Sequence, residues 1–223
     1  MKLYYDPIST TSRPVMLFAL DHDLQLDLEH VDLMTGQSQE PAYLRINPNG
    51  VVPYLIDDDG FALGESSAIL KYLADRIGSP AYPTELQARA RINAAMDWFA
   101  TNLHKDYCVF VAYGQLGILK GMDPVAVEAL KAYGETKAPR WLSILETEMI
   151  GDNDFVCGPE ITLADYLGSA FITLGELVAY DLSPYPNIRR WLARMKAGPS
   201  WNVAYAAFNG WLSAARSQTQ VTA

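Results

Sequence analysis

A turn-and-strand motif, followed at a fixed distance by a helix-start motif, most constrains what this chain can fold into. Residues 47–53 read Asn-Pro-Asn-Gly-Val-Val-Pro, and the pair Glu65-Ser66 follows twelve residues after Pro53. A strand that opens on Val52-Pro53 can present an unpaired backbone edge to an extended peptide. A helix that begins at Ser66 offers free amides and a positive dipole end to a carboxylate. Together the motifs predict a site for a short acidic peptide.

Hydrophobic patterning predicts an α/β domain over residues 1–78. Strands are expected at 2–5, 26–31, 52–56 and 61–63, the last two joined by an Asp-Asp-Asp-Gly hairpin turn at 57–60. One helix is expected from Ser12, with Pro14 in its first turn, and another at 66–77 before Gly78. This β-α-β-(α)-β-β-α order is that of a thioredoxin-like domain.

A linker rich in proline, glycine and serine at 78–83 separates this domain from a helical region at 85–216. Helical periodicity predicts segments at 85–119, 124–149, 162–179 and 186–197, with Pro139 expected to kink or break the second. The sequence Thr162-Leu163-Ala164-Asp165 predicts a capping box. The predicted fold class is therefore a thioredoxin-like α/β domain followed by an all-α domain.

Composition and net charge limit the classes of partner that the chain can bind. The chain has 223 residues, half of them apolar, and a net charge of −9 without a basic cluster, so nucleic acid and anionic membranes are poor partners. No apolar run reaches membrane-spanning length. The only two cysteines, Cys108 and Cys157, form no metal-binding or C-x-x-C pattern, and no metal site is expected. A reducing cytoplasm fits this cysteine usage.

At their observed spacing the two motifs resemble the glutathione-binding half of the cytosolic glutathione S-transferases. Residues 31–39 resemble the theta class, and Leu103-His104-Lys105 resembles the beta class. The resemblance implies a bacterial-type transferase that conjugates the glutathione thiolate to small, mostly apolar electrophiles in detoxification. It implies glutathione as co-substrate, no metal or prosthetic group, and a homodimer.

The resemblance assigns catalysis to Ser9, which lies four residues before Arg13 as the serine of the theta and delta classes does. A hydroxyl that donates a hydrogen bond to sulfur favours the thiolate, which is the nucleophile. Thr10 is the rival, since the beta class has its cysteine at the matching position. Alternatively, Ser9 only caps the helix.

The resemblance also assigns glutathione contacts. Val52, before Pro53, pairs its backbone with the cysteinyl unit, Glu65 meets the γ-glutamyl ammonium and Ser66 holds the γ-glutamyl carboxylate. The theta class has His-Lys where this chain has Ser38 and Gln39, so a neutral hydrogen bond from Gln39 is expected to replace a basic contact with the glycyl carboxylate. The alternative for Glu65-Ser66 is an ordinary helix start.

In an α-helix, His104, Tyr107, Cys108 and Val111 share one face. We interpret His104 as a glutathione-site residue, and the other three as a wall of the second-substrate pocket. The alternative is that this face packs into the core, as Cys108 does more often than it reacts. Phe208, Trp211 and Leu212 either cover the site or pack.

Two other functions stay open. Another glutathione-dependent enzyme on the same scaffold, such as a dehalogenase, etherase, peroxidase, disulfide reductase or isomerase, would keep the binding site and change only the second pocket. A non-catalytic ligand-binding protein would need no combination of Ser9, Glu65 and Ser66. Fold alone does not decide between them.

Overall fold

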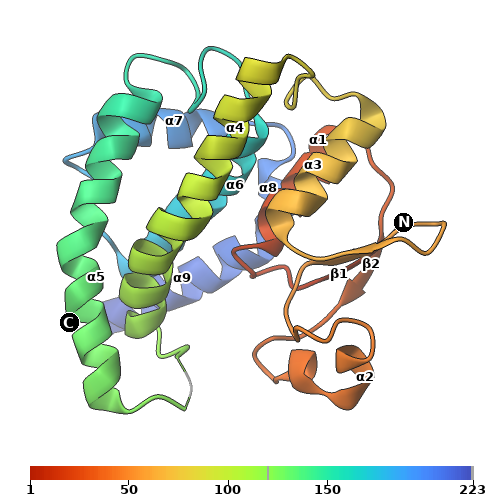
Figure 1. Cartoon of the computed structure of the whole chain (residues 1–223). Helices are drawn as coiled ribbons and strands as arrows, with labels where there is room; N and C mark the ends of the chain where they lie inside the picture. The colour runs from red at the N-terminus through yellow and green to blue at the C-terminus, as the bar shows by residue number, and fades with distance from the viewer. Residues whose placement is uncertain (120, 222–223) are drawn as a thin grey trace.

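The thioredoxin-like order is present in a computed structural model, which describes residues 1–119 and 121–221 (Figure 1). The elements of this domain are β1 (Lys2–Tyr5), α1 (Ser12–Asp21), β2 (Asp27–His30), the 3₁₀ turn η1 (Gln37–Gln39), α2 (Pro41–Leu44), β3 (Tyr54–Ile56), β4 (Ala62–Leu63) and α3 (Ser66–Ile77). The fold class predicted from the sequence is confirmed.

The sheet has the strand order β2-β1-β3-β4. Strand β1 pairs parallel to β2, with Leu3 opposite Leu28, and antiparallel to β3, with Leu3 opposite Leu55. Leu3 and Leu55 are fully buried and join the core cluster that also contains apolar residues of α1 and α3. This places the loops after β1 and before β3 side by side, which is where the candidate site lies.

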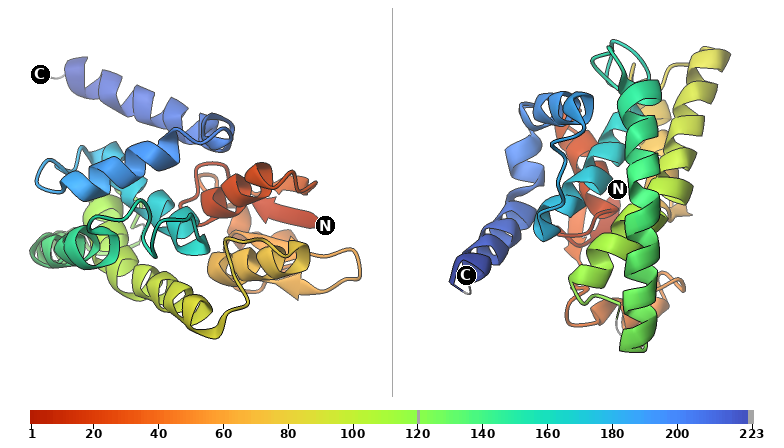
Figure 2. Two further views of the ribbon diagram at one scale, coloured as in Figure 1. Left: turned by 90° about the horizontal axis from the view of Figure 1, so that it is seen from above. Right: turned by 90° about the vertical axis from the view of Figure 1, so that its left-hand side faces the viewer.

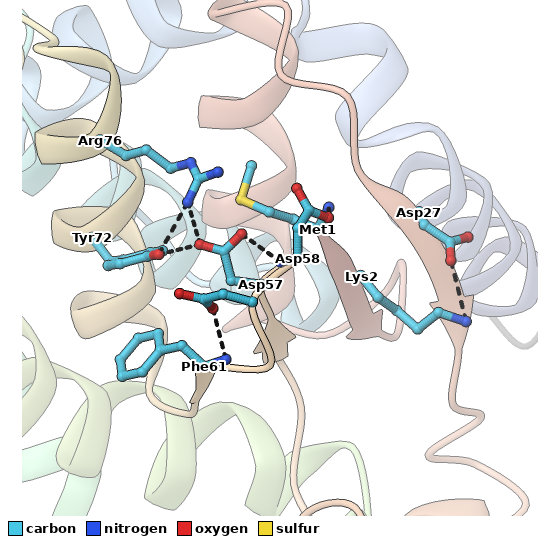
Figure 3. Close-up of polar contacts among 9 residues, drawn as sticks. Met1, Lys2, Asp27, Asp57, Asp58, Phe61, Tyr72 and Arg76 are labelled. Atoms are coloured by element: carbon cyan, nitrogen blue, oxygen red, sulfur yellow. Dashed lines mark hydrogen bonds and ion pairs between the residues drawn. The ribbon is translucent and has the colours of Figure 1, made fainter.

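The β3–β4 hairpin is fixed by a buried carboxylate (Figure 3). Asp57 accepts hydrogen bonds from the Tyr72 hydroxyl and the Arg76 guanidinium, both on α3. The Tyr72 hydrogen bond is the main reason that the pKa of Asp57 is lowered. The terminal amine of Met1 pairs with Asp58 at 2.6 Å. The contacts of Asp57 hold the hairpin against α3, the helix that carries Ser66, and the Met1 pair joins the hairpin to the start of β1.

The second domain is helical. Its elements are α4 (Leu86–Trp98), the π-helical η2 (Phe99–Tyr113), α5 (Pro124–Ile144), the π-helical η3 (Leu145–Ile150), α6 (Leu163–Leu174), the 3₁₀ turn η4 (Gly175–Val178), α7 (Pro186–Lys196), α8 (Trp201–Ala204) and α9 (Ala206–Val221). Figure 2 shows α9 at the edge of the molecule. The helix α5 runs through Pro139, so Pro139 does not break it, and the alternative of a kink at Pro139 stays a prediction.

Asp165 organises the start of α6. The predicted capping box forms, because Asp165 accepts from the Thr162 amide and hydroxyl at 2.8 and 2.9 Å. Its other oxygen accepts from the Val156 amide at 2.8 Å and the Trp191 indole at 2.9 Å. Every residue of α6 is buried, and this helix contacts both α1 and α3. The two domains therefore share one core around α6.

None of the helices within residues 1–119 and 121–221 combines the length and apolar character needed to cross a bilayer.

Candidate active site

The loop between β1 and α1 carries Ser9, which does cap the helix. Its hydroxyl oxygen accepts from the amides of Thr11 (3.3 Å) and Ser12 (3.2 Å). The same oxygen lies 3.1 Å from the Thr11 hydroxyl. Because Thr11 donates its single hydroxyl hydrogen to the Val52 carbonyl at 2.9 Å, Ser9 is the donor of this pair. Rotation about one bond can redirect the Ser9 hydrogen to a ligand.

Thr10 faces a different way from Ser9. Its hydroxyl lies 3.0 Å from the hydroxyl of Tyr113, at the end of η2. Thr10 is only 3% exposed, and burial raises the pKa of Tyr113. The two neighbouring hydroxyls of the loop therefore have separate surroundings. The Ser9 hydroxyl caps α1, and the Thr10 hydroxyl is hydrogen-bonded to Tyr113 of the helical domain.

The loop before β3 presents the backbone of Val52, and the Val52-Pro53 peptide bond is cis. The preceding carbonyl, of Val51, accepts from the Tyr43 hydroxyl at 2.7 Å and the Asn47 amide group at 2.8 Å. The Val52 amide donates no hydrogen bond to any residue in the described ranges. This amide is thus available to an extended ligand, as the sequence predicts.

Glu65 and Ser66 stand at the start of α3. Glu65 is exposed and has a φ of +65°, a conformation that residues other than glycine rarely adopt. Ser66 is the first helical residue and is 7% exposed. Its hydroxyl has no hydrogen-bond partner among the residues that the structure describes. Free hydroxyl, free first-turn amides and the helix dipole together suit a carboxylate.

These groups surround one cavity of about 350 Å³. Its walls come from the loop after β1, the loop before β3, the start of α3 and the helix η2. The lining residues are Ser9, Thr11, Leu33, Gly50, Val51, Val52, Pro53, Glu65, Ser66, His104 and Tyr113. The structure therefore brings together six of the residues that the sequence assigns to catalysis and glutathione binding.

A second cavity of about 290 Å³ adjoins the first and is mostly apolar. The two cavities share Ser9, Leu33 and Tyr113. The other lining residues are Ile8, Thr10, Met34, Leu116, Gly117, Ile118, Leu174 and Trp211. The first cavity contains the Glu65 carboxylate and the Ser66 hydroxyl, and the second is more apolar, so two cavities that meet at Ser9 can hold two different reactants in contact.

His104 stands in the wall of the first cavity. Its ring lies 4.7 Å from the ring of Phe171 and 6.4 Å from that of Tyr113, measured between centroids. Burial lowers the pKa of His104 below its ordinary value of 6.5. The imidazole is therefore neutral at pH 7, and it offers the cavity a polar but uncharged group.

Tyr107, Cys108 and Val111 do not line either cavity, so the prediction that they form the second pocket is corrected. All three are at most 1% exposed. The Tyr107 hydroxyl donates to the Ile172 carbonyl at 3.1 Å, and the Cys108 thiol lies 3.5 Å from the Phe171 carbonyl. Burial raises the pKa of the Cys108 thiol. These side chains belong to the core between η2 and α6.

The π-helical register of η2 explains that error. His104 and Tyr113 are nine residues apart, and in an α-helix of 3.6 residues per turn they would lie on opposite faces. Hydrogen bonding from residue i to i+5 widens the turn to about 4.4 residues, so that nine residues make about two turns. His104 and Tyr113 consequently share the cavity face, whereas Tyr107 and Val111 turn away from it, and Cys108 is buried against the Phe171 carbonyl.

Gln39 is also placed differently from its prediction. Its side-chain nitrogen donates to the Gly50 carbonyl at 2.8 Å and lies 3.3 Å from the Ser38 hydroxyl. Both amide hydrogens are therefore engaged, and Gln39 is absent from the cavity lining. A side chain at Gly50 would approach this nitrogen to 2.6 Å, which, with a φ of +62°, accounts for glycine there.

Sequence reasoning missed Thr11, Leu33 and Tyr113, and it left Trp211, which lines the second cavity, undecided between covering the site and packing. Thr11 follows Ser9 and Thr10 directly and lines the first cavity. The sequence does not show which of these three neighbouring hydroxyls faces the cavity. Tyr113 could have been found by extending the π register from His104. In the described ranges, His, Cys, Asp and Glu side chains form no group of three that could hold a metal ion.

Comparison with known proteins agrees with this geometry. The family model described as glutathione S-transferase, N-terminal domain, matches residues 3–81, and the corresponding C-terminal domain matches residues 112–199. Human glutathione S-transferase theta-2 is 34% identical over 200 residues, which are 88% of this chain and 81% of that protein.

Solved structures give the same answer. A delta-class glutathione transferase from Nilaparvata lugens has a TM-score of 0.81 and 33% identity, with 96% of this chain and 99% of that chain covered. Human glutathione transferase theta-2, solved in complex with glutathione, has a TM-score of 0.84 and 32% identity, with 98% and 91% covered. This chain therefore belongs to the glutathione S-transferase family, and it is a transferase that uses glutathione as its co-substrate.

Proposed function

We propose that glutathione occupies the first cavity, that its sulfur lies at Ser9, and that a small apolar electrophile occupies the second cavity. The observation that carries this assignment is the shared boundary: Ser9 lines both the cavity that contains Glu65 and Ser66 and the more apolar cavity beside it. A glutathione thiol held at Ser9 lies beside an electrophile in the second cavity without further movement of the chain. Orienting two reactants in this way supplies much of the rate enhancement available to a bimolecular reaction.

The γ-glutamyl and cysteinyl units find partners at the two predicted motifs. The exposed Glu65 carboxylate pairs with the ammonium, and the Ser66 hydroxyl and first-turn amides of α3 bind the carboxylate. The free Val52 amide donates to the cysteinyl backbone. Gln39 acts one step away: its bonds to Gly50 hold the loop that carries Val52.

Ser9 supports the reaction by donating its hydroxyl hydrogen to sulfur. The thiol proton leaves to water, the thiolate forms a bond to an electrophilic carbon, and the leaving group departs with the bonding electron pair. The free thiol has a pKa of roughly 8.5, so thiolate is the minor form at pH 7 without assistance. The hydroxyl hydrogen and the start of α1 both favour the anion.

The cellular setting follows from the same assignment. We infer a cytoplasmic homodimer that detoxifies electrophiles. The reducing cytoplasm supplies glutathione and suits the two free cysteines, Cys108 and Cys157. The apolar character of the second cavity favours apolar over charged electrophiles.

The decisive experiment follows thiolate absorbance of the glutathione complex against pH for wild type, Ser9→Ala and Thr10→Ala. Loss of one hydrogen bond to an anion, worth roughly 1.5–3 kcal/mol, should raise the thiol pKa by about one to two units in Ser9→Ala. Thr10→Ala should titrate like wild type. A shift in Thr10→Ala alone would move the thiol contact to the neighbouring hydroxyl. Unchanged curves for both variants would refute the role of this loop.

A further inference from the structure

Arg13 is a buried cation without a counter-ion. It is the second residue of α1 and has no solvent exposure. Its guanidinium donates to the Thr173 hydroxyl at 3.0 Å and to the Ala170 carbonyl at 3.2 Å, and its Nε has no partner. Within residues 1–119 and 121–221, no carboxylate lies within ion-pair distance of it.

Two aromatic rings take the place of a carboxylate. The guanidinium carbon lies 3.9 Å from the ring centroid of Phe208 and 4.7 Å from that of Tyr205. Both rings are at most 1% exposed, so these cation–π contacts are fully desolvated. The planar guanidinium can stack and donate hydrogen bonds at once, which a lysine ammonium cannot do.

Two of the groups that Arg13 contacts lie within three residues of a residue that lines the second cavity. Thr173 precedes Leu174, at the end of α6, and Phe208 lies three residues before Trp211 on α9; Leu174 and Trp211 both line that cavity. At the other end, the Arg13 amide donates to the Ser9 carbonyl at 3.1 Å. Arg13 thus connects the loop of the reacting thiol with two walls that face it.

The fold has no need of a cation here. The Thr173 hydroxyl has the Ser169 and Ala170 carbonyls within 2.9 and 3.0 Å, so neither Thr173 nor Ala170 loses its last hydrogen bond when Arg13 is removed. Burying a charge without a counter-ion is costly, and an apolar residue of similar size often serves stability as well or better. A buried charge that the fold does not require indicates that Arg13 has a role in the site.

We propose that Arg13 is a positioning residue that sets the distance between Ser9 and the Leu174–Trp211 walls, and thereby selects electrophiles by size. This inference rests on the proposed assignment of the second cavity to the electrophile. An aromatic electrophile that reaches Trp211 depends on Arg13. A two-carbon electrophile that stays beside the sulfur does not.

The test compares kcat/KM for 1-menaphthyl sulfate and for bromoethane at saturating glutathione, in wild type, Arg13→Met, Arg13→Lys and Trp211→Leu. Arg89→Met is the matched control, because Arg89 also stacks on an aromatic ring, that of Tyr82 at 4.1 Å, but its partners Tyr82 and Asp75 belong to neither cavity. For Arg13→Met we expect about a tenfold loss with the aromatic sulfate and less than about a twofold loss with bromoethane, because only the larger electrophile reaches the walls that Arg13 positions. Arg13→Lys should recover part of the loss, and Arg89→Met should match wild type.

Glutathione KM and the free energy of unfolding are measured for the same variants and should stay close to wild type in Arg13→Met. Equal losses with both electrophiles, or a parallel rise in the glutathione KM, would show a general structural role and overturn the inference. If Trp211→Leu changes the selectivity and Arg13→Met does not, the inference alone fails. If Trp211→Leu leaves both rates unchanged, the assignment of the second cavity fails, and the inference fails with it.

Discussion

The hydroxyl oxygens of Thr10 and Tyr113 lie 3.0 Å apart and join the loop after β1 to the end of η2. Each hydroxyl is the other's partner, so removing either one leaves a buried polar group unpaired. We expect Thr10→Val and Tyr113→Phe each to lower the free energy of unfolding by about 1–2 kcal/mol. The double variant should lose less than the sum, with a coupling of about 1 kcal/mol in chemical denaturation. Strictly additive losses would show that the pair makes no net contribution.

The start of α3 should supply most of the affinity for glutathione. The double variant Glu65→Ala, Ser66→Ala loses two charge-assisted contacts worth roughly 1.5–3 kcal/mol each, so calorimetric titration should show weakening by at least about a hundredfold. Ser67→Ala is the matched control, because Ser67 follows in the same helix turn and lines neither cavity. Because the Ser66 hydroxyl caps nothing in the described ranges, stability should change little. Unaltered affinity in the double variant would remove the γ-glutamyl assignment.

His104 should make the protein sensitive to mild acid. Burial lowers its pKa in the folded state below 6.5, so the unfolded chain binds this proton first. The contribution of His104 to stability is therefore complete above about pH 6.5 and is lost as pH falls toward the folded pKa, by up to about 1.4 kcal/mol per pH unit. Urea unfolding of His104→Phe between pH 7 and 5 should lack this part of the decline. Parallel curves for both proteins would contradict the lowered pKa.

Assembly gives a separate test. A homodimer should scatter light with about twice the 24.7 kDa mass of the chain at micromolar concentration, because cyclic two-fold symmetry is the commonest arrangement of soluble oligomers. Sedimentation at several concentrations gives the dissociation constant. A single 24.7 kDa species across that range would exclude the dimer.

Those parts of the fold and site that depend on local chemistry could be predicted from the sequence. The Val52-Pro53 segment that leads into β3, the helix start at Ser66 and the capping box at Asp165 are each specified by residues within a few positions of one another. The resemblance to the glutathione S-transferases assigned Ser9, Val52, Glu65 and Ser66 to one site, and all four line the first cavity. Six of the eleven residues that line the first cavity were therefore assigned from the sequence, whereas Thr11, Leu33 and Tyr113 were among those that were not.

The second cavity could not be predicted from the sequence, because it depends on helix register and on contacts between distant segments. The α-helical period assigned Tyr107 to the pocket, whereas the π register places Tyr113 there. Trp211 reaches the same cavity from α9, about a hundred residues later in the chain than Tyr113. The predicted contact of Gln39 with glutathione is not supported for a simpler reason. Its side chain already donates to the Gly50 carbonyl, which no sequence pattern shows.

The shared wall of Ser9, Leu33 and Tyr113 has a consequence for turnover. A conjugate is one molecule that fills both cavities, and it keeps the binding contributions of both former reactants without the entropy of holding them separately. The product should therefore bind more tightly than either substrate and compete with each. Its departure would then limit the steady-state rate, and an initial burst of conjugate in rapid mixing, followed by slower release, would reveal this.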